Sequence, residues 1–265
     1  MNIDRILKIF NHSARGRSKT PRPQEFTILV PVYAETTALA FSKFYFDALG
    51  AKVLYVLDSK KASRLSEVEN LVQQSVPTYE NPGSYLEFGY DKLVAKAPTD
   101  WILRIDCDEV PTPEMLSFCN DFIRHGRRGI GMFDRRQLRW HENTLQEMDW
   151  ADYHEVQSRF FNRSRVKFDH TLHTPGIKVP ILGRIKAPLL AKILHLDFVF
   201  NSHSDRVNKS ARYELAGQVK SVSNYYRTHP DTHNWCIAKN EGLEAVYRRW
   251  LNQFPAVESQ ATKSI

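Results

Sequence analysis

Two spacings of hydrophobic residues alternate along the first half of the chain. Apolar runs with the character of buried strands occupy 26–33, 51–58 and 100–106. Between and after them, apolar residues recur every three or four positions, which predicts helices over 37–50, 63–75 and 85–97. Strands that alternate with helices predict an α/β fold, with a mostly parallel central sheet and helices on both of its faces.

The carboxyl ends of parallel strands meet at one edge of a sheet, and folds of this class bind ligands in the crevice outside that edge. Three acidic residues fall at the ends of predicted strands: Glu35, Asp58 and Asp106. The pattern therefore predicts a ligand site where these three side chains converge.

The pattern becomes more polar after residue 110. A helix that begins at prolines is predicted over 111–126, and longer strands or hairpin arms are predicted over 129–140 and 155–168. A further apolar strand is predicted over 191–200.

The chain divides into three predicted parts. Residues 1–24 hold six basic side chains and a single acidic one, with apolar residues at helical spacing over 3–10. Such a helix can lie on an anionic membrane surface; the alternatives are a helix packed on the domain and a frayed terminus. Residues 25–200 are expected to form the α/β domain, and residues 201–265 a helical extension packed on it. Two basic helices are expected in that extension, over 205–227 and 234–253.

Composition narrows the class of protein. The chain has 265 residues, and an apolar content of 42% supports a well-buried core. Its apolar runs are shorter than the about 18 residues that span a bilayer, so we expect a soluble, cytoplasmic protein. Three cysteines without a CxxC pair argue against disulfides, a zinc site and redox chemistry. No nucleic-acid motif accompanies the charge of +7, so no nucleic-acid partner is expected.

The segment 99–116 places three carboxylates directly behind an apolar strand, at Asp106, Asp108 and Glu109. Residues two apart share a face of a strand, so Asp106 and Asp108 can point together while Cys107 turns away. This spacing suits one hard divalent cation, Mg²⁺ or Mn²⁺, shared with substrate phosphates. The alternative is a solvated turn in which Asp108 and Glu109 cap the following helix.

Three segments together resemble family 2 glycosyltransferases with the GT-A fold: ILVPVYAET at 28–36, VLYVLD at 53–58 and DWILRIDCDE at 100–109. The likeness is closer to the clade that contains lipopolysaccharide core β-glucosyltransferases, and it covers roughly residues 26–200. It implies a metal-dependent, inverting transfer from a nucleotide sugar, a uridine diphosphate sugar, to a glycan or lipid-linked acceptor. The implied cofactor is Mn²⁺ or Mg²⁺.

The resemblance also implies roles for individual residues. The implied nucleotide-binding residues are Pro31, Tyr33, Glu35, Asp58, Asp91, Asp106, Lys209 and Arg212. The implied metal ligands are Asp106, Asp108 and the late histidine His195, with Glu109 as a frequent third acid. A lone histidine in an apolar strand has the alternative of a hydrogen-bonded core position. For Lys209 and Arg212 the alternative is an exposed helix face.

The sequence departs from the family where the catalytic base is expected. Arg159 resembles part of the family's Arg-Leu-Phe strand, but His173 and Thr174 stand where a His-Glu pair would follow. An inverting transferase needs a base within hydrogen-bond reach of the acceptor hydroxyl. Asp152 is the preferred candidate, with a plain loop acid as its alternative, and His173 is the second. Other acids in this region are Asp134, Glu155 and Asp169.

Two alternatives remain open for the region and for the whole chain. Arg135, Arg136 and Arg139 flank Trp140, and this group can bind an anionic acceptor or a sugar ring, or form a solvated basic strand face. The loss of the acid at Thr174 also fits a GT-A-like module that binds glycan or nucleotide without turnover.

Overall fold

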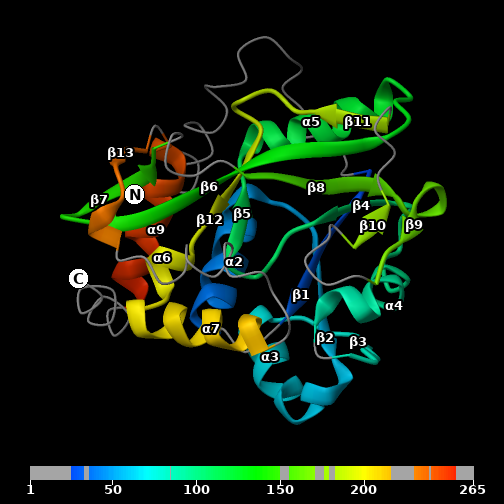
Figure 1. Cartoon of the computed structure of the whole chain (residues 1–265), viewed down its shortest axis with the longest axis horizontal. Helices are drawn as coiled ribbons and strands as arrows, with labels where there is room; N and C mark the ends of the chain where they lie inside the picture. Colours follow the sequence, from blue (N-terminus) through cyan, green and yellow to red (C-terminus); the bar gives the residue numbers. More distant parts are fainter. Residues whose placement is uncertain are drawn as a thin grey trace.

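The computed structural model describes eight stretches of the chain: 25–32, 36–83, 85–149, 155–170, 176–178, 183–215, 230–238 and 240–254. For residues 212–215 and 241 it describes only the backbone. Among these residues, no helix combines the length and the apolar character needed to cross a membrane. The described chain forms a central sheet covered by helices (Figure 1).

One half of the sheet is parallel. β1 (Thr27–Val32) lies between β2 (Val53–Asp58) and β4 (Trp101–Arg104), and β3 (Thr78–Tyr79) lies outside β2. Ile28 of β1 stands opposite a residue of each neighbouring strand. All six residues of β1 are buried, as its continuous apolar sequence requires. The strands predicted at 26–33, 51–58 and 100–106 are confirmed.

The other half of the sheet is mostly antiparallel. β8 (Glu155–Asn162) lies between β4 and the long β6 (Ile130–His141) and runs antiparallel to both. β6 turns through Glu142 and Asn143, both with positive φ, into β7 (Thr144–Met148). Two such residues form the turn that matches the twist of a hairpin. β13 (Trp235–Ile237) pairs with the outer edge of β7.

β12 (Lys192–His195) brings a later part of the chain back to this half. It runs parallel to β6 and antiparallel to β5 (Glu109–Pro111). The strand predicted over 191–200 therefore ends early: the Leu196 N–H donates to the carbonyl of Asp108 at 2.8 Å, and α6 (Asp197–Phe200) begins. The remaining short strands are β11 (Arg184–Lys186), beside β6, and the separate pair β9 (Lys167–Phe168) and β10 (Ile177–Lys178).

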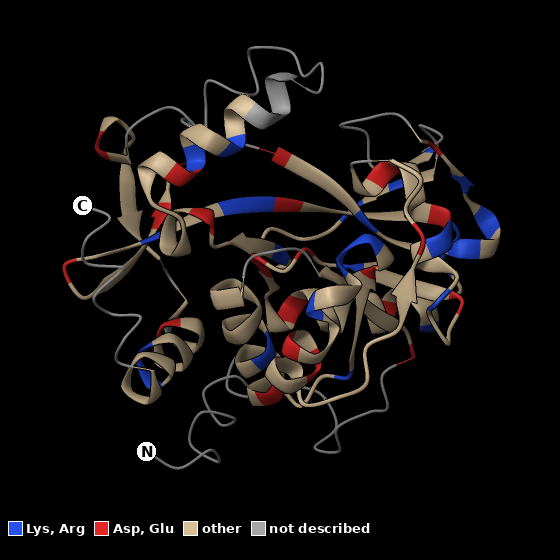
Figure 2. Cartoon of the chain, turned by 90° about the horizontal axis from the view of Figure 1, so that it is seen from below, with Lys and Arg blue, Asp and Glu red and all other residues tan. Residues whose placement is uncertain are grey.

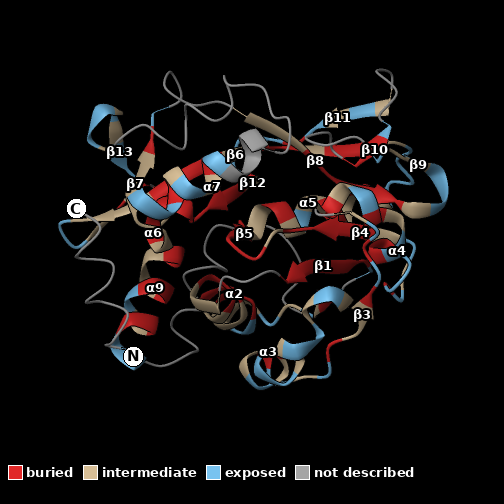
Figure 3. Ribbon diagram, turned by 60° about the horizontal axis from the view of Figure 1, so that its bottom comes forward, coloured by how far each residue is buried: buried red, intermediate tan, exposed pale blue. Residues whose placement is uncertain are grey.

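Alternate residues of β1 face opposite sides of the sheet, and different helices cover those sides. Ile28 and Val30 pack in a core with α2 (Thr36–Leu49), α3 (Leu65–Val72) and α5 (Pro113–Arg124). Leu29 packs on the other side with α4 (Tyr90–Val94). Figure 3 shows β1 and β4 buried within the molecule. Burial of each such side chain contributes about 1.5–3 kcal/mol. The predicted α/β class, a central sheet flanked by helices, is confirmed.

Local sequence fixes several helix ends. Gly50 ends α2 with a φ of +65°, a left-handed conformation that favours glycine because it has no Cβ. Pro113 lies in the first turn of α5, where no intrahelical N–H bond is lost. Among the described residues, two 3-10 turns precede helices, η1 (Ser59–Arg64) before α3 and η2 (Leu86–Gly89) before α4, and two flank strands, η3 (Arg163–Arg165) after β8 and η5 (Pro230–Thr232) before β13. The helix predicted over 85–97 is therefore split into η2 and α4.

A third core joins the last described helix to the domain. In α9 (Glu241–Gln253), the apolar residues Leu243, Val246, Tyr247 and Trp250 share one face and pack in a cluster with Phe41 of α2. The rings of Tyr247 and Trp250 both lie 5.4 Å from the ring of Phe41, edge to face. Of the predicted basic helices, the described parts are α7 (His203–Leu215) and α9, and β13 occupies the start of the second.

Replacing Trp250 by alanine tests whether α9 belongs to the cooperative core. We expect Trp250→Ala to lower the free energy of unfolding by about 3–5 kcal/mol, because a fully buried aromatic side chain leaves a cavity. Asn252→Ala, at an exposed position of the same helix, should change it by less than about 0.5 kcal/mol. Urea denaturation followed by circular dichroism measures both. A separate transition for α9, or equal effects of the two substitutions, would contradict this role.

Candidate active site

The parallel strands deliver their acidic residues to one edge of the sheet. Asp58 ends β2, and its Oδ1 accepts the Lys60 N–H at 3.0 Å, which caps the turn that follows. β4 ends at Arg104, and the chain passes through Asp106 and Asp108 before β5 begins at Glu109. Asp58, Asp108 and Glu109 are all buried, so the run of acids is not a solvated turn.

Asp106 and Glu109 are held in a network of arginine side chains. Asp106 Oδ2 accepts from Nη2 of Arg104 at 2.8 Å and from Nη2 of Arg159 at 2.9 Å. Glu109 Oε1 accepts from the same Arg159 nitrogen at 2.8 Å and from Arg135 at 3.2 Å. Glu109 Oε2 accepts the backbone N–H of Asp106 at 3.0 Å, which closes the turn. Figure 2 shows that charged residues of both signs lie on strands in the middle of the molecule.

Burial sets the electrostatics of this network. Loss of solvation raises the pKa of Glu109 above its ordinary value, the nearby Asp106 adds to the rise, and Arg135 opposes it. Burial likewise raises the pKa of Asp106 above its ordinary value, against the pull of Arg104. A buried carboxylate is tolerated only when a cation compensates it. The arginines therefore determine whether this turn can fold as it does.

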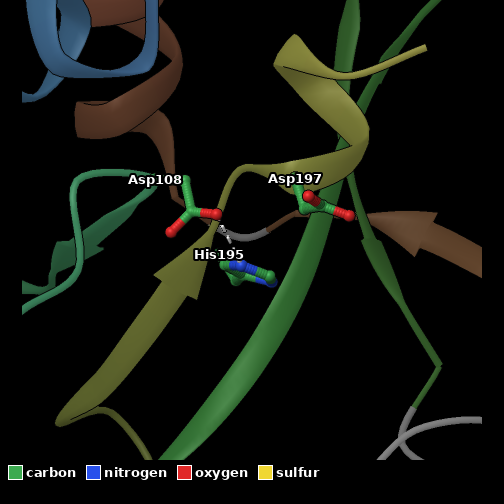
Figure 4. Close-up of side chains that lie close together, drawn as sticks. All are labelled: Asp108, His195 and Asp197. Carbon is green, nitrogen blue, oxygen red and sulfur yellow. Dashed lines mark hydrogen bonds and ion pairs between the residues drawn. The ribbon is translucent and has the colours of Figure 1, made fainter. Parts of the chain in front are cut away.

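Asp108 points to a different group of side chains. One ligand atom each from Asp108, His195 and Asp197 lies within 4.8 Å of the others. Asp108 comes from the turn after β4, His195 is the last residue of β12, and Asp197 is the first residue of α6. All three are buried, and Figure 4 shows them converging from these separate elements. The pairing of β12 with β5 brings the early acid beside the late histidine.

The His195 ring is oriented by Gln137 of β6. Its Nδ1 lies 2.7 Å from Gln137 Oε1, and its Nε2 lies 3.2 Å from Asp108 Oδ2. An amide oxygen only accepts, so Nδ1 is the donor in the contact with Gln137. Nε2 is then the ring nitrogen that faces the carboxylates. A histidine whose second nitrogen is fixed by a hydrogen bond is the arrangement in which imidazole binds metals.

Lys209 of α7 adds a cation to the same group. Its Nζ lies 3.0 Å from Asp197 Oδ1 and 3.4 Å from Asp108 Oδ2. Burial raises the pKa of both carboxylates, but Lys209 and then His195 overcome that effect and hold each pKa below its ordinary value. Asp108 and Asp197 are therefore ionised at neutral pH.

The donor set fits a divalent cation. It consists of two ionised carboxylates and an imidazole, and carboxylates suit Mg²⁺ and Mn²⁺ while imidazole favours transition metals. Asp197 Oδ2 is buried and has no hydrogen-bond partner among the described residues. A buried carboxylate oxygen without a donor is costly unless a cation or another donor meets it. The combined preferences favour Mn²⁺ over Mg²⁺ for Asp108, His195 and Asp197.

The structure separates the residues predicted to hold the metal. Asp108 and His195 belong to the cluster, whereas Asp106 lies outside it, with its carboxylate bonded to two guanidinium groups. Asp197 was not predicted. Its signal was present, because it follows His195 by two residues in the segment HLD, the same spacing as Asp106 and Asp108.

The other predicted residues are distributed as follows. Pro31 is buried in β1, opposite Val56, and Asp91 lies in the first turn of α4. Tyr33, Glu35, Asp152 and His173 lie outside the described residues, and Arg212 is described only by its backbone. Among the further acids, Asp134 pairs with Lys186 at 3.2 Å and Glu155 accepts from Arg135 at 2.7 Å.

The basic residues of β6 form internal contacts instead of a solvated face. Arg136 is buried and donates to Glu147 at 2.7 Å, while Arg135 joins the Glu109 network. The guanidinium carbon of Arg139 lies 4.5 Å from the ring centre of Trp235. Trp140 packs against α9 (Glu241–Gln253), with its ring tilted and 4.9 Å from that of Tyr247. These side chains join β6 to its neighbours in the sheet and to the last helix.

Comparisons with known proteins give distant structural similarities. No protein-family model and no curated protein matches the sequence. S. aureus TarS 1–349 in complex with UDP-GlcNAc is 11% identical, over 77% of this chain and 70% of that one, with a TM-score of 0.38. A 4-diphosphocytidyl-2C-methyl-D-erythritol synthase is 20% identical, over 54% and 77%, with a TM-score of 0.34. HddC from Yersinia pseudotuberculosis is 10% identical, over 65% and 93%, with a TM-score of 0.38. Similarity at this level leaves the function to be argued from the site.

Removing Arg159 should destabilise the whole domain. Arg159→Met leaves Asp106 and Glu109 without the guanidinium that both contact, and breaking a buried ion pair of this kind costs about 3–5 kcal/mol. The control is Arg165→Met, which removes an exposed arginine from the turn after the same strand and should cost less than about 1 kcal/mol. Chemical denaturation measures both variants. Equal stabilities would show that the network does not carry the turn.

Proposed function

We propose that this chain is a glycosyltransferase of the GT-A type that uses a nucleotide sugar and a divalent cation. The observation that carries the proposal is the convergence of Asp108, His195 and Asp197 at the carboxyl end of β4. That position lies beside the sheet edge at which folds of this class bind nucleotides. The resemblance of the sequence segments to family 2 glycosyltransferases, and to the lipopolysaccharide core β-glucosyltransferase clade, supports a sugar as the transferred group.

The nucleotide is proposed to lie across the ends of β1, β2 and β4. Asp58 Oδ1 caps the Lys60 amide, so Oδ2 is the oxygen proposed to accept from the base or ribose. Tyr79 of β3 lies near Asp58. Burial is the main cause that raises the pKa of Tyr79, and the negative charge of Asp58 adds to the rise. We propose uridine diphosphate as the nucleotide part, with Tyr33, Glu35, Asp91, Lys209 and Arg212 as further contacts.

Asp108, Asp197 and His195 are the residues proposed to hold the cation. A divalent cation held by these residues would neutralise the charge that develops on a diphosphate leaving group. The chain's own contribution is orientation: Gln137 fixes the imidazole, and the Leu196 N–H fixes the turn at Asp108. The network around Glu109 keeps that turn rigid, so the ligands are placed before the substrate arrives.

The acceptor side of the reaction is proposed from the sequence. We propose an inverting transfer to a glycan or lipid-linked acceptor, with Asp152 as the base and His173 as the second candidate. Asp134 and Glu155 are each paired with a cation, Lys186 and Arg135 respectively, so their carboxylate oxygens are already engaged within the protein. We also propose a cytoplasmic location with peripheral contact between the basic residues 1–24 and anionic lipid.

A non-catalytic nucleotide-binding module is the second candidate. Thr174 in place of the family's acid favours it, since a site without a base could still bind a donor. Release of sugar from a UDP sugar in the presence of Mn²⁺ separates the candidates. Turnover that Asp152→Asn reduces would support the enzyme, whereas donor binding without any turnover would support the module.

Binding of UDP with Mn²⁺ tests the donor site directly. We expect isothermal titration calorimetry to show binding that Asp108→Asn weakens by about 100-fold, because the substitution removes a charged ligand. Asp100→Asn is the matched control, since Asp100 is an exposed acid just before the opposite end of β4, paired only at the surface with Arg163. It should leave the affinity unchanged. Wild-type protein that binds neither UDP nor GDP or CDP with Mn²⁺ would overturn the proposal.

A further inference from the structure

Lys209 reaches from α7 (His203–Leu215) into the cluster of Asp108, His195 and Asp197. Its Nζ contacts one oxygen of each carboxylate, at 3.0 Å for Asp197 and 3.4 Å for Asp108. Its side chain is 14% exposed. The ammonium thus lies against the same two carboxylates that a metal ion would need.

The cluster requires a cation at all times. Asp108 and Asp197 are 6% and 0% exposed, and two ionised carboxylates at this depth are strongly unfavourable without compensation. Lys209 meets this need by geometry, because its ammonium lies within hydrogen-bond distance of one oxygen of each carboxylate. His195 also contacts Asp108, but its other ring nitrogen is hydrogen-bonded to Gln137. Lys209 therefore performs in the free protein the electrostatic role that a metal ion would perform in a complex.

We infer that Lys209 is a resident cation that exchanges with the metal ion: it compensates Asp108 and Asp197 in the free protein and moves to the donor diphosphate when metal and nucleotide bind together. This inference rests on the proposed function, because it takes the ligand to be a nucleoside diphosphate. It adds that the metal and the nucleotide bind cooperatively, and that one side chain causes the cooperativity.

Electrostatics explains why the two cations exchange. An ammonium and a divalent ion that share two carboxylates repel each other strongly at short range in a buried site. A metal ion that arrives alone must displace Lys209 and break its contacts with Asp108 and Asp197. A diphosphate removes that penalty, because it offers the ammonium new anionic oxygens beside the metal. By linkage, the nucleotide then tightens metal binding by the same factor as the metal tightens nucleotide binding.

The surrounding contacts allow the side chain to move while the helix stays in place. Arg206, one turn earlier, donates to the Asn201 carbonyl at 2.9 Å and lies 4.1 Å from the ring of Phe198. Ser210, the next residue, is fully buried. These neighbours fix the backbone of α7 on both sides of Lys209. A lysine carries its charge on a flexible four-carbon stem, so exchange requires only new rotamers.

The experiment measures Mn²⁺ affinity without nucleotide, by electron paramagnetic resonance of free Mn²⁺, for wild-type protein and Lys209→Met. Methionine keeps an unbranched stem and removes the charge. We expect Lys209→Met to bind Mn²⁺ about tenfold more tightly or better than wild type, the usual size of such couplings. Lys209→Arg should keep the weak binding of wild type, and Lys96→Met, which removes an exposed lysine after α4, should leave it unchanged.

The second arm repeats the titration with saturating UDP. We expect UDP to tighten Mn²⁺ binding by about tenfold or more in wild type and far less in Lys209→Met. If Lys209→Met does not fold without metal, its recovery on addition of Mn²⁺, followed as a rise in melting temperature, serves as the readout, and wild-type coupling is tested as before. No recovery together with no coupling in wild type overturns the inference.

The outcomes separate this inference from the proposed function. Tight Mn²⁺ binding to wild type in the absence of nucleotide would overturn the role of Lys209, even when UDP binds. Equal Mn²⁺ affinities of wild type and Lys209→Met would do the same. A tenfold gain in Lys209→Met without any nucleotide binding supports the resident cation and overturns the proposed donor instead.

Discussion

The structure depends on the compensation of carboxylates that lie buried or half-buried in the turn after β4. Charge in this position is tolerated only where a cation meets it at hydrogen-bond distance. Two separate groups of cations meet this requirement within residues 106–109. Asp106 and Glu109 are compensated by arginines, and Asp108 is compensated by Lys209 and by His195. One short turn thus contains both a structural ion network and a candidate metal site.

Both halves of the sheet supply side chains to that turn, and Arg104 at the end of β4 joins the cations that come from the antiparallel half. The parallel half delivers the acids, because the carboxyl ends of its strands meet at one edge. The antiparallel half delivers Arg135 and Gln137 from β6, Arg159 from β8 and His195 from β12. Alternation along β6 sends Arg135 and Gln137 toward the turn, whereas the intervening Arg136 pairs with Glu147. The order of strands across the sheet therefore determines the electrostatics of the site.

The sequence predicts the parallel half well and the site only in part. Apolar runs and helical spacing are local signals, and they locate β1, β2, β4 and the helices between them. The roles of Asp106 and Asp108 could not be distinguished locally, because both belong to one DxD pattern. The distinction comes from the two arginines that bond Asp106, and one of them, Arg159, lies 53 residues away in sequence.

Asp197 shows a second limit of prediction from the sequence, which again arises from a contact between distant segments. The apolar residues over 191–200 fit a continuous strand, but the bond from the Leu196 N–H to the Asp108 carbonyl ends β12 and starts α6. That bond joins segments far apart in the sequence, so the local spacing of apolar residues cannot predict it. The spacing of His195 and Asp197 was the usable signal, since two ligands two residues apart repeat the pattern of the first acids.

The choice of cation in each half of the turn agrees with its role. A guanidinium is permanently charged and planar, and a single one can bond two carboxylates, as Arg159 does with Asp106 and Glu109. These ion pairs are expected to stay closed, because opening one would leave a charge without a partner in an apolar interior. An ammonium is a compact point charge on a flexible stem, and its contacts to Asp108 and Asp197 have no fixed plane. Arginines therefore bond the carboxylates that have a structural role in the turn. Lysine is used at the carboxylates that exchange one cation for another in the inferred mechanism.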